Sequence, residues 1–119
     1  MTVTAVTPIE VEWVDIGSVG DILPQSARVV RTPQGDVAVF RTAADTYYAI
    51  DNRCPHRGGP LSEGIVHGDA VTCPLHNWVI SLATGRSLGA DNACVATVPI
   101  KAEAGRLFLA HRPLAAEAA

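Results

Sequence analysis

Short apolar runs rich in Val, Ile and aromatic residues alternate along the chain with Gly, Pro and Asp, and no segment keeps an apolar helical period for three turns. Three of these runs contain turn residues where a hairpin would reverse, at 33–36, 67–69 and 103–105. The only helical candidate is a turn or two at 17–24, which Pro24 ends. The pattern predicts an all-β antiparallel fold, with strands expected within 11–17, 27–42, 46–51, 64–73, 78–88 and 94–110.

Length and charge narrow the class of protein. A chain of 119 residues is large enough to bury one core of its own and too small for two domains. The net charge is −3 and the Lys and Arg residues are scattered, so we expect no nucleic-acid partner. The N-terminus lacks the basic start and apolar run of a signal peptide, and no stretch approaches the roughly 20 apolar residues of a membrane span. We therefore expect a cytoplasmic protein without a membrane partner.

Two similar loops carry the candidate chemistry, "CPHRGGPL" from residue 54 and "CPLHNW" from residue 73. Together they read Cys-x-His, sixteen residues, Cys-x-x-His, with ligand candidates Cys54, His56, Cys73 and His76. A two-iron, two-sulfide cluster held by two thiolates and two imidazoles needs this set of donors. In an extended loop, side chains two residues apart point the same way roughly 6 to 7 Å apart, which suits ligands that reach two neighbouring irons. The predicted hairpin between the loops would bring them together.

The loops also contain residues that suit a cluster. Prolines fix φ in both loops, and the glycine pair at 58–59 lets main-chain N–H groups approach bridging sulfides. A tetrahedral zinc site is the main alternative for two Cys and two His, but the single residue between Cys54 and His56 is shorter than zinc sites usually use. An odd count of three cysteines also argues against a disulfide framework.

On these loops, and on "ATGRSLG" and "VPIKAEAGRLFL" further along, the chain resembles a Rieske [2Fe-2S] domain, most closely the small subunit of assimilatory NAD(P)H-dependent nitrite reductase. The resemblance implies an antiparallel β sandwich or barrel carrying a small cluster-binding subdomain of two loops. It implies that Cys54 and Cys73 bind one iron and His56 and His76 the other. The domain would span 11–112, after an N-terminal extension (1–10) and before a frayed tail (113–119).

The same resemblance implies a function. The chain would relay electrons to a large catalytic subunit that carries FAD, a [4Fe-4S] cluster and sirohaem and reduces nitrite to ammonium. No complete active site is expected on this chain alone, because it contains no phosphate-binding loop, nucleophile elbow or carboxylate pair. Two alternatives stay open: a free Rieske-type ferredoxin that serves an aromatic-ring dioxygenase, and a subunit without a cluster that only stabilises its partner. A carrier often has an acidic face, whereas a subunit should present an apolar patch.

Other chemically distinctive residues have ordinary interpretations. Cys94 falls in a predicted strand and is expected to be a buried small apolar residue. His67, at a hairpin turn, and His111, near the end of the chain, are expected to be solvated. Trp78 is expected to be a core residue, and a contact with the cluster or a partner is its second interpretation. Arg57 is either a solvated loop charge or a docking contact beside the cluster.

Overall fold

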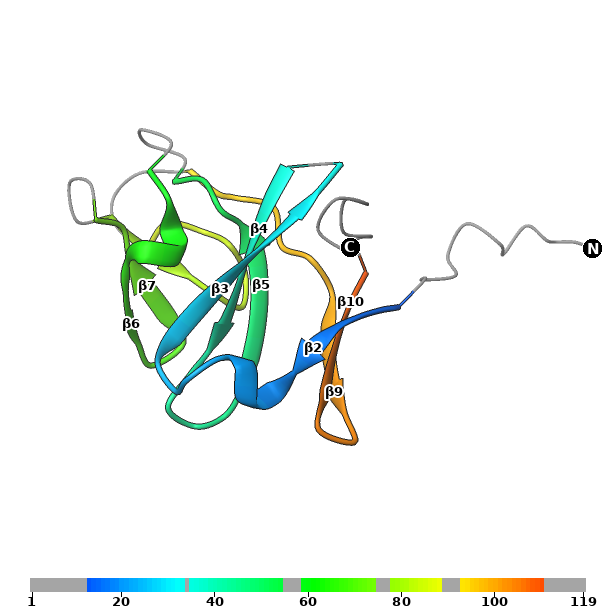
Figure 1. Cartoon of the computed structure of the whole chain (residues 1–119). Coiled ribbons are helices and arrows are strands. Elements are labelled where there is room, and N and C mark those ends of the chain that lie inside the picture. Colours follow the sequence, from blue (N-terminus) through cyan, green and yellow to red (C-terminus); the bar gives the residue numbers. More distant parts are fainter. Residues whose placement is uncertain (1–12, 34, 55–58, 75–77, 89–92, 111–119) are drawn as a thin grey trace, which may run out of the picture.

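The computed structural model describes residues 13–33, 35–54, 59–74, 78–88 and 93–110. In them, three antiparallel three-stranded sheets pack against one another, with the central sheet between the other two (Figure 1). The first sheet has the order β2 (Val14–Ser18), β10 (Arg106–Leu109), β9 (Ile100–Glu103). The central sheet consists of β3 (Ser26–Thr32), β4 (Gly35–Arg41) and β5 (Tyr47–Asp51). The third sheet consists of β6 (Ile65–His67), β7 (Ala70–Thr72) and β8 (Val79–Ser81).

The central sheet is buried on both faces, and its sequence reflects this. Along β4, Val37 and Val39 point to one core, which they share with Leu107 of β10. Their neighbours Ala38 and Phe40 point to the other face, toward a core shared with the third sheet. Since successive side chains of a strand alternate between faces, a strand covered on both sides has a continuous apolar run. That is why "VAVF" shows no alternation.

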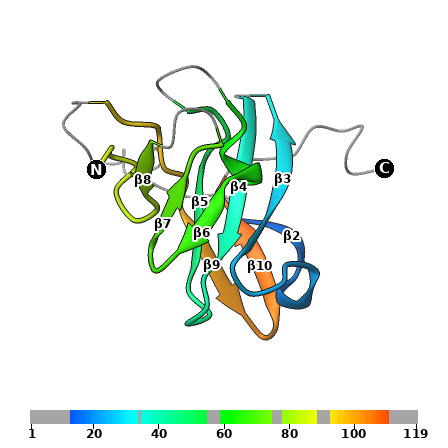
Figure 2. The same cartoon turned by 90° about the vertical axis from the view of Figure 1, so that its left-hand side faces the viewer.

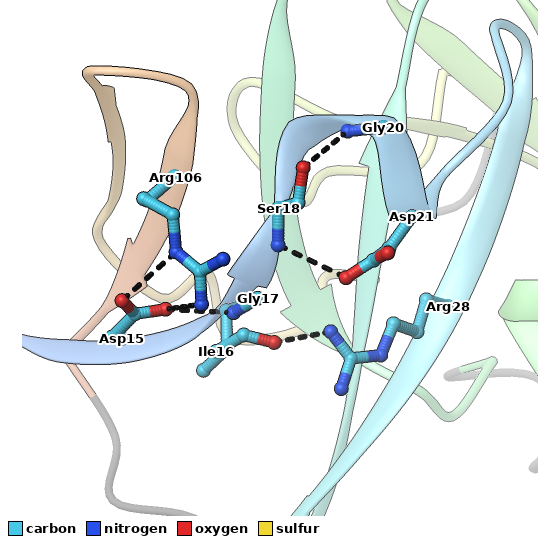
Figure 3. A network of polar contacts seen from close by, with 8 residues as sticks. All are labelled: Asp15, Ile16, Gly17, Ser18, Gly20, Asp21, Arg28 and Arg106. Atoms are coloured by element: carbon cyan, nitrogen blue, oxygen red, sulfur yellow. Dashed lines mark hydrogen bonds and ion pairs between the residues drawn. The ribbon is translucent and has the colours of Figure 1, made fainter.

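Side chains hold the first sheet against the central one where no strand ladder joins them (Figure 3). The Arg28 guanidinium, from β3, donates to the main-chain carbonyl of Ile16 in β2. Between the two strands, the short 3-10 turn η2 (Val19–Asp21) is closed by a capping box, in which the Ser18 hydroxyl accepts from Gly20 N–H at 3.1 Å. The Ser18 N–H in turn donates to the Asp21 carboxylate at 2.9 Å. These bonds satisfy main-chain groups that a β ladder would otherwise pair.

The all-β prediction is confirmed, and so are its three hairpins: β3 with β4, β6 with β7, and β9 with β10. The helical candidate at 17–24 is the 3-10 turn η2. Two regions are less regular than expected. In 78–88 only β8 is a strand, and in 94–98 the chain makes isolated bridges. A second 3-10 turn, η3 (Leu61–Glu63), was not predicted, because its three residues are too few to establish a period.

The expected N-terminal extension (1–10) and C-terminal tail (113–119) lie outside the described residues. In the described part of the chain, no helix has the length and apolar character needed to cross a bilayer.

Candidate metal centre

The two cysteine loops each begin where a strand of a different sheet ends. Cys54 lies three residues after β5, and Cys73 directly follows β7. Each cysteine donates its own main-chain N–H across the loop that it opens: Cys54 to the carbonyl of Gly59 at 2.8 Å, and Cys73 to that of Trp78 at 2.6 Å. A main-chain hydrogen bond therefore closes each loop at its cysteine. This bond fixes the position of the cysteine main chain, from which the sulfur projects into the core.

Both sulfurs are buried in the same core. Cys54 is 1% exposed and Cys73 is 0% exposed, and both belong to the core between the central sheet and the third sheet. None of the three cysteines forms a disulfide. A buried cysteine can be a plain apolar residue, but two buried cysteines in one core, each opening a loop, also fit a soft metal centre that binds thiolate. On chemistry and burial, the cysteines present fit an iron–sulfur cluster.

The first loop is tied to the central sheet on its far side as well. The Asn52 side-chain oxygen, just after β5, accepts from the Ser62 N–H at 2.7 Å. Leu61 beside it is fully buried in the same core as the two cysteines. Further along the chain, Gly64 approaches the end of β7, just before the second loop, so closely that a Cβ atom there would lie 2.2 Å from the Thr72 carbonyl oxygen. Contacts on both sides thus position the first loop against the second.

The structure describes one half of the predicted ligand set. It places Cys54 and Cys73 together, whereas His56, His76 and Arg57 lie outside the described residues. In the described part of the chain, no group of three or more Cys, His, Asp and Glu side chains could hold a metal ion. The two histidine ligands therefore remain a prediction from the sequence.

The predictions for two other residues are confirmed. Trp78 is half-buried and packs against the core that contains both cysteines. His67 is exposed at the end of β6, where its ring Nε2 lies 2.7 Å from the Thr72 hydroxyl. His111 lies outside the described residues.

The prediction for Cys94 is wrong, because its side chain is exposed. Cys94 makes an isolated antiparallel bridge with Arg86, and the next residue, Val95, is the one that faces the core. Neighbouring side chains of extended chain point to opposite sides, so burial of Val95 turns Cys94 outward.

The sequence did not predict a polar link beside the core that contains Cys54 and Cys73. The Tyr48 hydroxyl, from β5, interacts with the Asp69 carboxylate in the turn between β6 and β7. Burial raises the pKa of this phenol, and the negative charge of Asp69 raises it further. Tyr48 also packs against the core that contains the cysteines. This interaction links the central sheet to the third sheet, and no sequence signal indicates it because the two residues are far apart in the chain.

Comparison with known proteins identifies the family. The Rieske [2Fe-2S] domain family matches residues 12–99. The chain belongs to this family. Its members' cofactor is the Rieske [2Fe-2S] cluster, and the buried thiols of Cys54 and Cys73 agree with it. The Rieske fold of mostly antiparallel sheets with almost no helix is also that of the ferredoxin of carbazole 1,9a-dioxygenase from Nocardioides aromaticivorans, at a TM-score of 0.75.

Characterised relatives come from several redox systems. The chain is 32% identical over 108 residues to 4beta-methylsterol monooxygenase of Methylococcus capsulatus, but it spans only 29% of that protein's length, against 82% of its own. It is 29% identical to the ferredoxin component of the alkene monooxygenase system of Xanthobacter autotrophicus, covering 91% of this chain and 88% of the ferredoxin. These matches, together with the domain family, make the chain a Rieske-type electron-transfer domain.

One solved structure is similar over nearly its whole length. It is a protein of Mycobacterium tuberculosis assigned as an NADH-dependent nitrite reductase small subunit, with a TM-score of 0.77 and 24% identity. The match covers 88% of this chain and 98% of that one. At this level of identity the likeness establishes a shared fold, and the role of the chain has to be argued from its own residues.

Proposed function

We propose that the chain is the electron-transfer small subunit of an assimilatory nitrite reductase. The observation that carries the proposal is the sequence of the two loops, "CPHRGGPL" and "CPLHNW", on a fold that closes both loops at their cysteines. Full-length similarity in fold to the assigned small subunit from M. tuberculosis supports it. The partner is a large catalytic subunit that carries FAD, a [4Fe-4S] cluster and sirohaem and takes electrons from NAD(P)H to reduce nitrite to ammonium.

In this role Cys54, Cys73, His56 and His76 hold the cluster, which supplies one-electron transfer when bound. The described residues contribute placement and shielding. Buried Leu61 and half-buried Trp78 belong to or pack against the core of the two thiols and keep water from that side. Two neutral imidazoles in place of two thiolates make the oxidised centre less negative, and this favours electron uptake.

A ferredoxin of an oxygenase system is the second candidate. The match to the alkene monooxygenase ferredoxin component favours this candidate, because it covers 88% of the length of that ferredoxin. Both roles use the same cluster and differ in association. A carrier must leave its partner after each electron, whereas a subunit stays bound.

Co-purification separates the two candidates. The chain, tagged at one end, is expressed in its native host growing on nitrate, and the proteins that remain bound after a wash in moderate salt are identified together with their absorption spectra. We expect a large protein with the visible bands of sirohaem, in a fixed ratio to the chain. Recovery of an oxygenase or its reductase, with no sirohaem protein, would reject the subunit role and support the carrier.

A control addresses the open possibility of a subunit without a cluster. The isolated chain is reconstituted with iron and sulfide, and its iron content and paramagnetic spectrum are measured after reduction. We expect a Rieske-type signal. A colourless chain that still binds the large subunit would leave the association intact and remove the electron-transfer role.

A further inference from the structure

The pairing register defines a row of four side chains on the outer face of the third sheet, and three of them are apolar. Ile65 of β6 pairs with Thr72 of β7, and Thr72 pairs with Val79 of β8. The row continues past β8, because Leu88 donates its main-chain N–H to the Val79 carbonyl at 2.8 Å. Partners in an antiparallel pair point to the same face. We call these four residues, Ile65, Thr72, Val79 and Leu88, the outer row.

The adjacent positions show which way the outer row points. Val66, Val71 and Ile80 pair with one another one residue along, and they are 6%, 0% and 0% exposed. They form the inner face of the sheet, so the outer row faces away from the core. Ile65 is 70% exposed and Leu88 is 59% exposed. Figure 2 shows β6, β7 and β8 side by side on the side of the molecule turned to the viewer.

The outer row is next to the cluster-binding loop. Thr72 directly precedes Cys73, and Val79 directly follows Trp78. With strands about 4.8 Å apart, four residues span roughly 14 Å across the sheet. Ile65 and Leu88 stay exposed at the two ends of this row, and large exposed apolar side chains on a small domain mark an interaction surface.

The charged residues on the same face indicate what kind of partner surface would fit there. The next row along the sheet has His67, Ala70, Ser81 and Arg86, so neither row contains a carboxylate. Arg86 is exposed, and within the described residues its guanidinium makes no ion pair or hydrogen bond. A complementary surface would therefore present an apolar patch with a carboxylate at one end.

We propose that the outer row and Arg86 form the docking site for the protein with which this chain exchanges electrons. This partner places an apolar patch on Leu88 and Ile65 and a carboxylate on Arg86. The proposal rests on the proposed function for the identity of the partner, the large nitrite reductase subunit. A second copy of the chain fits less well. Its own outer row and the row beside it contain no carboxylate that could meet Arg86, so two copies facing each other would leave this charge unpaired.

The test measures the dissociation constant of the reconstituted chain for the purified large subunit by calorimetry. Leu88→Glu and Ile65→Glu should each weaken binding about tenfold or more, since each buries a charge in the contact. Leu23→Glu is the matched control, because Leu23 is 71% exposed and lies outside the three sheets. It should bind within about twofold of the unchanged chain. Leu88→Ser removes the apolar contact without adding charge, and should give a smaller loss in the same direction.

The charge is tested separately. Arg86→Glu should weaken binding and Arg86→Lys should largely preserve it, and the difference should shrink as salt is raised. The visible circular dichroism of the cluster should be the same in all variants, which shows that the loops are intact. Equal binding by the chain and its Leu88→Glu and Ile65→Glu variants would overturn the proposal.

Failure of the proposed function has a different signature. If the unchanged chain does not bind the large subunit, that function is rejected, and the same variants are measured against the purified oxygenase and reductase recovered with the chain. The docking site is then supported if the outer-row variants lose that binding and Leu23→Glu keeps it, and it is rejected if all variants bind alike. Light scattering on the chain alone should give a monomer; a dimer that Leu88→Glu dissociates would assign the row to a second copy instead.

Discussion

Single residues decide whether the two loops can hold a metal, and the cysteines allow a direct comparison. Cys54→Ser or Cys73→Ser should remove most of the iron and the visible absorption, because a hydroxyl is a much poorer ligand for iron than a thiolate. Cys94→Ser should leave both unchanged, since Cys94 is exposed and is not in the core of the other two. Iron content after reconstitution measures this. Equal iron in Cys54→Ser and Cys94→Ser would mean that Cys54 is only a packing residue.

A glycine between the loops is a second critical position. At Gly64 any side chain would meet the Thr72 carbonyl oxygen at 2.2 Å and a Val71 methyl at 2.9 Å. Gly64→Ala should lower the free energy of unfolding by about 1–3 kcal/mol, because main-chain atoms must move. Gly20→Ala is the control, since its Cβ would meet nothing closer than 3.7 Å. Urea unfolding measures both, and equal losses would show that the contact at Gly64 relaxes freely.

The sequence predicted some features of these residues and could not predict others. The placement of Cys54 and Cys73 in one core agrees with the sequence prediction, which used the loop spacing and the donor type, and their role as ligands stays a prediction. The exposure of Cys94 was not predicted, because it depends on which of two neighbours turns inward, and Val95 takes that place. The closeness of Gly64 to Thr72 depends on the register of the β6–β7 hairpin, in which the next residue, Ile65, pairs with Thr72, and the sequence predicted the hairpin but not its register.

At the scale of elements, an ion pair joins β2 to β10 and gives a pH dependence. Arg106 donates through two nitrogens to the Asp15 carboxylate, each at 3.0 Å (Figure 3). The Arg106 guanidinium, followed by the Gly17 N–H, lowers the pKa of Asp15. The folded state thus binds the Asp15 proton more weakly than the unfolded chain does. The pair contributes stability above the unfolded pKa of about 3.9, and this contribution is lost as pH falls through the lower folded pKa.

Asp15→Asn tests this assignment. The unchanged chain should be more stable than the variant at pH 7, and the difference should narrow below about pH 4 as Asp15 takes up its proton. Urea unfolding at several pH values measures it. In an Arg106→Gln background the same substitution should show a much weaker pH dependence, because the main cause of the shift is gone. An unaltered dependence in that background would assign the effect to Gly17 alone.

Elements differ in how well the sequence predicted them. The hairpins were predicted because each has turn residues between two apolar runs, as at 33–36 and 67–69. Residues 86–88 and 94–98 were predicted as parts of regular strands, yet they make isolated bridges, Ser87 to the third sheet and Thr97 to the central sheet. Pairing between residues distant in the chain is set by packing, which turn chemistry does not report. The outer row follows from that pairing, so it is visible only in the structure.

At the scale of the whole molecule, the two cores have different relations to the cluster. The core between the central and third sheets contains Cys54 and Cys73. The other core, between the central and first sheets, contains neither of them. A ligand that binds only the folded state stabilises the part of the structure that holds it. Removal of the cluster should therefore loosen the third sheet far more than the first.

Hydrogen exchange on the holo and iron-stripped chain measures this difference. Amides of β7 and β8 should lose protection by about tenfold or more when iron is removed by chelation under reducing conditions, and those of β9 and β10 should change by less than about threefold. β7 and β8 depend on the core that contains the cysteines, whereas Leu107 and Leu109 of β10 lie in the other core and are fully buried. The Cys94→Ser chain, treated in the same way, controls for modification of the exposed thiol. An equal loss of protection in both sheets would show that the domain opens as one cooperative unit and that the two cores are not energetically separate.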